Sequence, residues 1–324
     1  MEKLDLKDRK ILYELDIDSR QSFSHLGKKV GLHKDVVAYR VKKLQEKGII
    51  KGFYTVIDTS PLGYIHPRFY ILYQYATPEI KEEIIDYFVK SKYVGFVHEA
   101  EGSYELSLVM VVDNLTKFDF FWEKTMIKYR DYIANQTFSL YLRENMYRYS
   151  FFFDENSIER YDRTKVDVFG GEKRVKIDDF ELKILKIITP NARIQTTEIA
   201  NKLNTTAITI NNRIKRLMKI GIIKGFKVDV DLPKIGYQLY KADIILKEPE
   251  KHSNILKYIE KNPNLNHTIK SLGYVDLELV FYLENANQLH DIMRNLSINF
   301  PNSIKNYTYS SVIKTYKWNY MPED

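Results

Sequence analysis

One hexapeptide, Gly-Ile-Ile-Lys-Gly-Phe, occurs twice in this chain of 324 residues, at 48–53 and at 221–226. The same spacing of 173 residues aligns other identical residues without a gap from 5–64 to 178–237. Aligned identities include Asp5 with Asp178, Arg20 with Arg193, Arg40 with Arg213, and Gly63 with Gly236. Past that segment the spacing becomes 171. A period this long indicates one unit that has been duplicated, because solenoid repeats recur every ~20–50 residues. We call the two units copy 1 and copy 2.

The first part of each copy has helical periodicity followed by a strand. Three short segments of copy 1 place apolar residues at helical spacing, and these are 4–18, 22–31 and 34–47. Ser22 is a suitable N-cap for the second helix, and Gly31 allows a sharp turn before the third. Gly48 suits the end of the third helix, and residues 49–58 alternate as a strand does. This order predicts a winged helix-turn-helix domain in each copy.

The third helix of each copy has a basic outer face. Residues 34–47 contain five Lys or Arg and two acids, and residues 207–220 contain four Lys or Arg and no acid. A helix that enters the major groove needs base-reaching side chains near its N-terminus and cations for phosphates along its flank. A solvated helix face would explain either helix alone, but two copies favour double-stranded DNA as the partner. The predicted DNA-contacting residues are Lys34, Asp35, Tyr39, Arg40, Lys43, Thr206, Ile208, Asn211, Asn212, Arg213 and Arg216.

The two predicted recognition helices differ in the side chains that would reach base edges. Asn211 and Asn212 can bond adenine, and Ile208 can contact thymine methyl groups. Asp35 can accept a hydrogen bond from a cytosine amino group. We therefore expect the two copies to read different half-sites.

The second part of each copy predicts the order βαββαβ, which is the ferredoxin-like plait. The whole chain is thus expected to be α+β, with two winged helix-turn-helix domains alternating with two ferredoxin-like domains. A plait has helices on one face of its sheet only, so a partner or a second sheet must cover the other face. The predicted boundaries are 1–64 and 65–147 for copy 1, 148–174 for a linker, and 175–237 and 238–324 for copy 2.

Long, ordered strings in both copies resemble the Lrp/AsnC (feast/famine) transcription regulators of bacteria and archaea. Copy 1 has "LDLKDRKIL", "RQSFSHLGKKVGL" and "YRVKKLQEKGIIKGFYTVIDTSPLGY". Copy 2 has "IDDFELKIL", "RIQTTEIANKL" and "NRIKRLMKIGIIKGFKVDVDLPKIGY". The resemblance covers nearly the whole chain and implies a sequence-specific DNA-binding regulator. It departs from the family pattern at His33, where a Ser cap is preferred, and at Asn204, which replaces the Gly of the turn.

The resemblance also implies that the ferredoxin-like domains are RAM domains, which bind an amino acid or another small effector. The family's ligand turn reads Gly-x-Tyr/Phe-Asp, and the matching residues are Gly102-Ser-Tyr104-Glu105 and Gly273-Tyr-Val-Asp276. A tight hairpin turn explains each glycine equally well. Family members dimerise through RAM sheets, so we expect an internal pseudo-dimer within one chain, and further homo-oligomers.

Two alternatives remain open. The sirohaem decarboxylases resemble the same two-domain unit, and a DNA-free structural scaffold would need no recognition surface. The enzyme needs imidazoles and cations around a tetrapyrrole, but the seven histidines do not align between the copies, and His98 and His267 are out of register. We therefore expect no enzyme activity, catalytic residue or cofactor.

Composition excludes several other classes. The chain has no cysteine, which rules out disulfides, thiolate metal sites and cysteine nucleophiles, and no metal-spaced cluster is evident. It has no run of 18 apolar residues and a charged start, so we expect a cytoplasmic protein with no membrane partner. The net charge of +7 permits nucleic-acid binding without requiring it.

Overall fold

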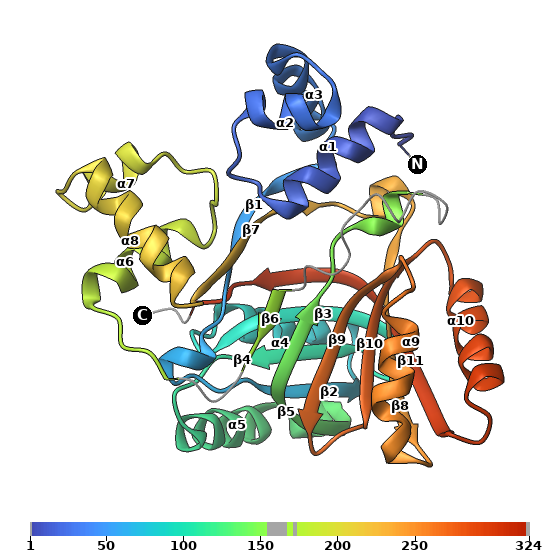
Figure 1. The fold of residues 1–324 in the computed structure, drawn as a ribbon. Helices are drawn as coiled ribbons and strands as arrows, with labels where there is room; N and C mark the ends of the chain where they lie inside the picture. The colour runs from blue at the N-terminus through green and yellow to red at the C-terminus, as the bar shows by residue number, and fades with distance from the viewer. Residues whose placement is uncertain (1, 154–166, 171–173, 322–324) are drawn as a thin grey trace. The chain divides into compact units, whose positions relative to one another are not determined.

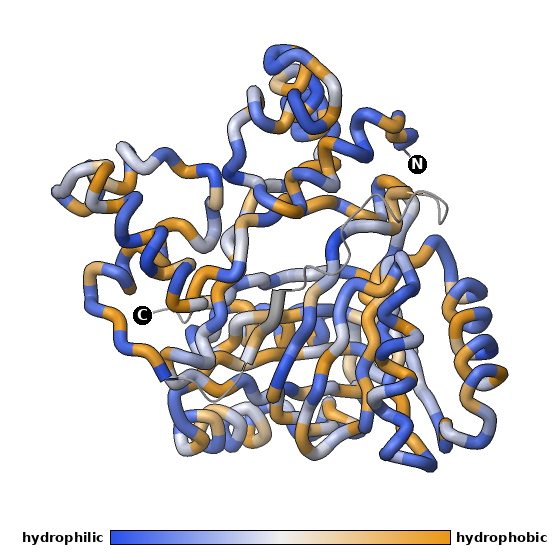
Figure 2. The backbone as a smooth tube through the Cα atoms, in the orientation of Figure 1, coloured by the Kyte–Doolittle hydropathy of each residue, from blue (hydrophilic) through white to orange (hydrophobic). Residues whose placement is uncertain are grey.

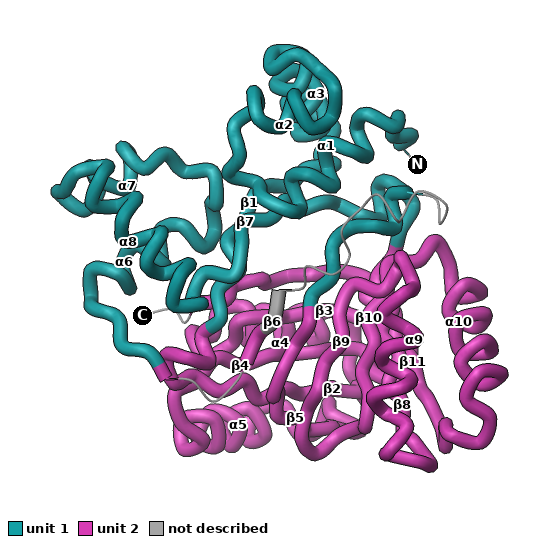
Figure 3. Tube along the Cα trace, in the orientation of Figure 1, with its two compact units in different colours: residues 1–58, 146–167, 175–237 teal, residues 59–145, 168–174, 238–324 magenta. Residues whose placement is uncertain are grey.

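The protein is described by a computed structural model for residues 2–153, 167–170 and 174–321, in two compact units (Figure 3). Unit 1 contains residues 1–58, 146–167 and 175–237, and unit 2 contains residues 59–145, 168–174 and 238–324. Each unit therefore combines residues from both copies, whereas the five predicted segments follow one another along the chain and stay a prediction. Among the described residues, no helix is both long enough and apolar enough to cross a membrane.

In unit 1, each copy contributes three helices and a strand (Figure 1). Copy 1 contains α1 (Leu6–Ile17), α2 (Phe23–Val30), α3 (Lys34–Glu46) and β1 (Ile50–Ile57). Copy 2 contains α6 (Asp179–Ile188), α7 (Thr196–Lys202), α8 (Ala207–Lys219) and β7 (Ile223–Val230). This order confirms the predicted helix-turn-helix fold of both copies.

The turns between the second and third helices follow from their residues. Ser22 caps α2 by accepting a hydrogen bond from the His25 N–H, and Gly31 ends α2 with a φ of 67°. In copy 2 Asn204 takes the corresponding turn with a φ of 50°. Asparagine tolerates this left-handed conformation better than most residues, so the replacement of glycine preserves the turn.

The strand after each recognition helix pairs with its counterpart in the other copy. Strands β1 and β7 form a two-stranded antiparallel sheet in which Tyr54 lies opposite Lys227. Two backbone bonds flank it, from Ser19 N to Phe226 O at 2.8 Å and from Ala192 N to Phe53 O at 2.9 Å. These bonds are equivalent under the 173-residue spacing, so the two copies meet in unit 1 with local two-fold symmetry.

The start of the predicted linker belongs to the core of unit 1. Tyr149 and the short 3₁₀ helix η3 (Ser150–Phe152) are buried, and Phe153 packs edge-on against Tyr13 of α1 with ring centroids 5.3 Å apart. The Tyr149 N–H donates to the Asp16 carboxylate over 3.1 Å. Residues 154–166 and 171–173 of the predicted linker lie outside the described residues.

Unit 2 contains the two predicted βαββαβ segments. Copy 1 supplies β2 (Pro67–Tyr73), α4 (Pro78–Lys90), β3 (Val94–Gly102), β4 (Leu106–Met110), α5 (Leu115–Tyr129) and β5 (Ile133–Met146). Copy 2 supplies β8 (Gln238–Leu246), α9 (His252–Ile259), β9 (Leu265–Leu272), β10 (Leu277–Leu283), α10 (Ala286–Asn299) and β11 (Ile304–Trp318).

The strands of both plaits join into one sheet. Among the described residues its order is β2-β4-β3-β11-β8-β10-β9-β5-β6, where β6 is Asp167–Phe169, and β2 also pairs with β5. Eight strands therefore close into a ring, with β6 added at β5. The long last strands join the copies, because β11 pairs first with β8 and then with β3, while β5 pairs with β2 and lies next to β9.

Alternation along the strands determines what each face of the ring meets. In β2, Phe69 and Ile71 belong to a buried cluster with Phe88 of α4 and Phe121 of α5. Arg68 and Tyr70 point to the opposite face, because successive side chains of a strand alternate, and they are only 3% and 4% exposed. Both faces of β2 are therefore buried.

Figure 2 shows hydrophobic and hydrophilic residues alternating along α10, as in a helix that buries one side.

Candidate nucleic-acid interface

The recognition helices α3 and α8 expose the side chains that were predicted to contact bases. In copy 1, Tyr39 is 63% exposed, and in copy 2, Ile208 is 73% exposed. Single exposed apolar side chains are common on protein surfaces, so this exposure leaves both residues accessible to a partner without indicating one. The other exposed residues of the predicted set are Lys34, Asp35, Lys43, Thr206, Asn211, Asn212 and Arg216.

The N-termini of the two recognition helices are capped differently. Thr206 caps α8, since its hydroxyl accepts a hydrogen bond from the Thr209 N–H over 3.2 Å. His33 occupies the N-cap of α3 and makes no side-chain capping bond there. A missing cap costs a helix ~1 kcal/mol, so the start of α3 is less stable than that of α8 on this account.

Arg40 and Arg213, the two arginines predicted to bind DNA phosphates, are half-buried behind the exposed faces of α3 and α8. Arg40 Nη1 donates to Asp5 Oδ2 and to Asp8 Oδ1, both over 2.7 Å. Arg213 repeats this contact with Asp178 Oδ2 at 2.8 Å. The hydrogen bonds that Arg40 donates to Asp5 and Asp8 raise the pKa of Arg40 above its ordinary value. Each arginine therefore fastens its recognition helix to the N-terminus of the first helix, and its contact with phosphate stays a prediction.

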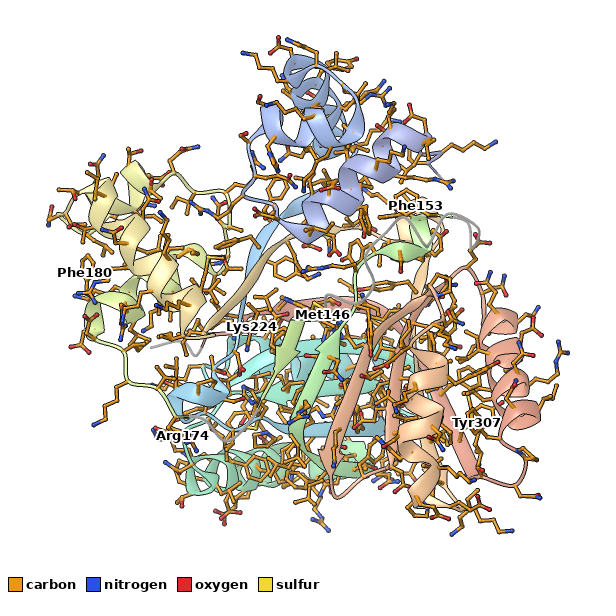
Figure 4. The ribbon with its side chains drawn as sticks, in the orientation of Figure 1. Met146, Phe153, Arg174, Phe180, Lys224 and Tyr307 are labelled. Atoms are coloured by element: carbon orange, nitrogen blue, oxygen red, sulfur yellow. The ribbon has the colours of Figure 1, made fainter. Side chains whose placement is uncertain are left out.

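In copy 2, the junction between the recognition helix and the N-terminus of the first helix has additional contacts. Asp178 and Glu181 form a capping box at the start of α6, and Glu181 also accepts hydrogen bonds from Arg216 over 2.5 Å. Phe180, labelled on α6 in Figure 4, places its ring 5.9 Å from the guanidinium carbon of Arg213. Arg216 is thus partly engaged within its own domain, as Arg213 is.

In copy 1 a pocket of about 350 Å³ opens between the N-terminal segment and α3. Its walls include the ion pair of Arg40 with Asp5 and Asp8, together with Tyr39 and Lys43. The Lys43 ammonium lies 6.0 Å from the centre of the Tyr39 ring. The pocket therefore places a cation and an aromatic ring beside the exposed face of α3.

The turns predicted to bind an effector have structural roles in unit 2. At Gly102, φ is 123° and a Cβ atom would lie 2.5 Å from the Tyr309 carbonyl oxygen, whereas Gly273 has a φ of 82° and open space around it. The Glu105 carboxylate accepts from the Tyr73 N–H over 2.9 Å, and Asp276 accepts from the Leu246 N–H over 2.7 Å.

These two acids occupy equivalent positions in the two copies. Each binds the backbone at the end of the first strand of its plait, so glutamate replaces aspartate without losing this bond. Tyr104 is buried, with its ring 4.6 Å from that of Tyr70. Effector binding by Gly102, Tyr104, Glu105, Gly273 and Asp276 stays a prediction.

A buried charged cluster inside the ring was not predicted from the sequence. Arg68 donates to Glu278 Oε1 over 2.6 Å, and Lys241 lies 2.9 Å from Glu278 Oε2 and also pairs with Asp243. Burial would raise the pKa of Glu278, but Arg68 and Lys241 hold it well below its usual range. Burial raises the pKa of Asp243 against the attraction of Lys241. The signal in the sequence is a charged residue inside an otherwise apolar strand, as in "PRFYILY" and "LELVFYL".

A second buried ion pair in unit 1 was also not predicted. Lys227 of β7 donates to Asp16 Oδ1 of α1 over 2.7 Å, and the two side chains are 1% and 0% exposed. Among the described residues, no group of three or more His, Asp and Glu side chains is placed to hold a metal ion.

Known proteins match both the helix-turn-helix segments and the whole chain. A family model described as an AsnC-type helix-turn-helix domain matches residues 4–45, and one described as winged helix-turn-helix DNA-binding matches residues 177–224. The HTH-type transcriptional regulator LrpB of Bacillus subtilis is 27% identical over 122 residues, which cover 38% of this chain and 82% of LrpB. An uncharacterized HTH-type transcriptional regulator of Pyrococcus abyssi is 30% identical over 102 residues, which cover 32% of this chain and 69% of that protein. The chain belongs to the Lrp/AsnC family.

The fold of this Lrp/AsnC protein extends over a solved structure of similar length. The crystal structure of the siroheme decarboxylase NirDL matches 98% of this chain and 94% of its own, with a TM-score of 0.64 and 13% sequence identity. At this identity the likeness concerns the fold alone. It shows that the α+β arrangement of this Lrp/AsnC chain has a counterpart over nearly its full length.

The structure of the Lrp/AsnC chain confirms that two histidines do not occupy equivalent positions. His98 lies opposite Ser107 in the pairing of β3 with β4, and His267 lies opposite Val280 in the pairing of β9 with β10. Under the 171-residue spacing, His267 therefore corresponds to Phe96, which lies opposite Val109. The two imidazoles also have different partners, since His98 Nδ1 lies 3.0 Å from Thr315 Oγ1 and His267 Nδ1 lies 2.8 Å from Glu144 Oε1.

Proposed function

We propose that this Lrp/AsnC protein is a sequence-specific DNA-binding transcriptional regulator in which the two copies form one internal DNA-binding pair. The observation that carries the proposal is the exposure of two different recognition helices in a single compact unit, joined through β1 and β7. The exposed residues of α3 and α8 include amides, cations and apolar groups, which are the types that read base edges and bind phosphates.

Reciprocal contacts between the copies support the internal pair. Arg20 donates to the Ala192 carbonyl, and Arg193 donates to the Ser19 carbonyl, each over 2.5 Å. Each guanidinium also lies 5.3 Å from a phenylalanine ring of the other copy, Phe226 for Arg20 and Phe53 for Arg193. These contacts reproduce within one chain what a symmetric dimer would form between two. Further homo-oligomers of this pair are proposed, and light scattering would measure their size.

The proposal is tested by selecting bound fragments from genomic DNA and measuring affinity by fluorescence anisotropy at several salt concentrations. Lys43→Ala should weaken binding to all sequences and lower the salt dependence by about one phosphate contact. Asn211→Ala should instead change the preferred sequence. Lys257→Ala, an exposed lysine of α9 in unit 2, is the matched control and should leave affinity unchanged. Failure to enrich any fragment would contradict the proposal.

We further propose that an amino acid or a similar small effector modulates this regulator at the turns after Gly102 and Gly273. The rings of Tyr104 and Tyr274 lie 4.6 and 5.0 Å from Tyr70, so residues of both turns meet near the cations of the ring. Titration calorimetry with the common amino acids is the test, with Tyr274→Phe as the variant. Heats that are unaltered by this substitution would place any binding elsewhere.

The alternative function, a tetrapyrrole enzyme, is supported by the fold that this chain shares with NirDL. We propose that the chain is not an enzyme, because both helix-turn-helix segments match DNA-binding or AsnC-type domain models and relatives such as LrpB are named transcriptional regulators. Addition of sirohaem to the purified protein should give no shifted absorbance band and no decarboxylated product. If the protein bound sirohaem tightly and decarboxylated it, the chain would be an enzyme and the proposal that it is a regulator would be contradicted.

A further inference from the structure

The contacts between the copies in unit 1 are of two kinds. The contacts of Arg20 and Arg193 occur twice, once in each direction, and a pair of identical copies could form them equally well. The ion pair of Asp16 with Lys227 occurs once. By the 173-residue spacing, its equivalents are Thr189 in copy 2 and Tyr54 in copy 1.

Because of this difference, pairs of like copies would bury unpaired charge. Two copy 1 units would bury two Asp16 carboxylates with no lysine beside them. Two copy 2 units would place Lys227 directly opposite another Lys227, since the register of β1 and β7 pairs Tyr54 with Lys227. Like charges directly opposite in a sheet are destabilising, and an unpaired buried charge is far more so.

The buried charges inside the ring of unit 2 also differ between the copies. In unit 1 copy 1 supplies the carboxylate of the ion pair, whereas in the ring copy 1 supplies the arginine and copy 2 supplies its carboxylate partner. Three buried positions differ between the copies, with Arg68, Tyr70 and Ser107 in copy 1 and Lys241, Asp243 and Glu278 in copy 2. In the chain as it stands, the two cations and two carboxylates balance, and Arg68 of copy 1 bonds Glu278 of copy 2. Two copy 1 units would bury two arginines without the Glu278 carboxylate to which Arg68 donates. Two copy 2 units would bury four carboxylates with two lysines.

We infer that the two copies pair selectively with each other, and that the buried charges at Asp16–Lys227 and Arg68–Glu278 exclude pairs of like copies. This inference rests on the internal pair proposed above. It has a functional consequence, since a DNA-binding pair then always presents one α3 and one α8. The surface that each copy offers fits the other copy of this same chain, and it disfavours the equivalent surface of a second molecule.

The test uses the full chain with a protease site inserted between residues 154 and 166. The folded protein is cleaved, unfolded in denaturant and refolded by dilution, and native mass spectrometry counts the pairs of fragments. Random pairing would make half of the pairs unlike. We expect unlike pairs to exceed like pairs by at least about tenfold, because breaking a buried ion pair is strongly unfavourable.

Three variants of the cleavable chain connect the preference to these charges. Lys227→Tyr with Glu278→Ser gives copy 2 the residues of copy 1, and should bring the ratio towards the random value. Asp16→Lys with Lys227→Asp exchanges the charges of one pair and should retain the preference. Arg20→Ala with Arg193→Ala, which removes contacts common to every kind of pair, should weaken association without changing the ratio.

A second measurement covers variants that refold poorly. In the uncleaved chain, Asp16→Thr and Lys227→Tyr should each lower the folding equilibrium constant by about a hundredfold or more, and the double variant should recover most of this loss. A random mixture of wild-type fragments would overturn the selective pairing while leaving the internal pair intact. Fragments that stay monomeric would overturn the internal pair itself. Neither result depends on DNA binding, which is measured separately.

Discussion

Arg40 and Asp5 form a charged hydrogen bond of 2.7 Å that fastens the recognition helix α3 to the N-cap of α1. The contact is repeated in copy 2 by Arg213 and Asp178. An arginine that already binds carboxylates must exchange them for phosphate when it contacts DNA. The two arginines can therefore act on DNA in two ways, by direct contact or by fixing the angle of the helix.

The double variant Arg40→Ala with Arg213→Ala should weaken DNA binding across all sequences, because neither a phosphate contact nor a helix orientation selects one base over another. Each substitution should also lower stability by about 1 kcal/mol, the upper range for partly exposed ion pairs. Affinity measured at several salt concentrations separates the two roles. Loss of direct contacts lowers the salt slope by about one for each phosphate, whereas loss of orientation leaves the slope unchanged. If the double variant bound DNA as tightly as the wild-type protein at about 0.15 M salt, neither role of the two arginines would hold.

Glycine is required at the two proposed effector turns for different reasons. Gly102→Ala should destabilise the protein by about 2 kcal/mol or more, since the new methyl group would clash with the Tyr309 carbonyl as well as straining φ. Gly273→Ala should cost about 1 kcal/mol, because only φ is unfavourable there. Chemical unfolding of both variants measures the difference. Equal losses would mean that β11 moves away from the turn at little cost.

The order of helices and strands could be predicted from the sequence because it depends on local signals. Ser22, Gly31 and Gly48 lie at turns or helix ends, where capping and turn preferences of single residues predict them. Because the unit is duplicated, each helix and strand could be assigned from two segments of the sequence. The exposed positions of α3 and α8 followed from the same periodicity. The capping bonds of Asp5 and Asp178 connect residues three apart and belong to this class.

Contacts between the copies could not be predicted in the same way, because they depend on which strand meets which across more than a hundred residues. The sequence indicates that β1 is a strand, but its pairing with β7 is determined by the tertiary structure and not by the local sequence. Arg68 in "PRFYILY" would be read as an outward-facing residue on a strand with one solvated face. It is buried because the sheet closes into a ring, and only then does Glu278 become its partner.

His98 should make stability depend on pH. Burial lowers the pKa of His98 to about 4, and its ordinary value is 6.5. As pH falls from about 6.5 to about 4, the unfolded chain binds a proton at this residue and the folded chain does not. The free energy of unfolding should therefore fall over this window, by roughly 1–3 kcal/mol given about 1.4 kcal/mol for each pKa unit.

The matched variants for this prediction are His98→Gln, which removes the titrating group, and His25→Gln at an exposed position of α2. Urea unfolding from pH 7 to pH 4 gives the slope for each protein. His98→Gln should flatten it, and His25→Gln should leave it as in wild type. Parallel curves for wild type and His98→Gln would show that the imidazole accepts a proton in the folded state at its ordinary pKa.

The DNA site should consist of two unlike half-sites. Positions 39 and 212 are equivalent under the 173-residue spacing, yet they present Tyr39 on α3 and Asn212 on α8, both exposed. An asparagine can bond an adenine edge, whereas a tyrosine offers a ring and one hydroxyl, so the two helices cannot prefer the same base pairs. The substitution Asn212→Tyr should therefore change the preferred sequence in one half-site, and Tyr39→Asn should change it in the other. Selection from a random DNA pool followed by sequencing reads both halves at once. A palindromic consensus for wild type, or a change in both halves from either single substitution, would show that α3 and α8 do not each read one half of the site.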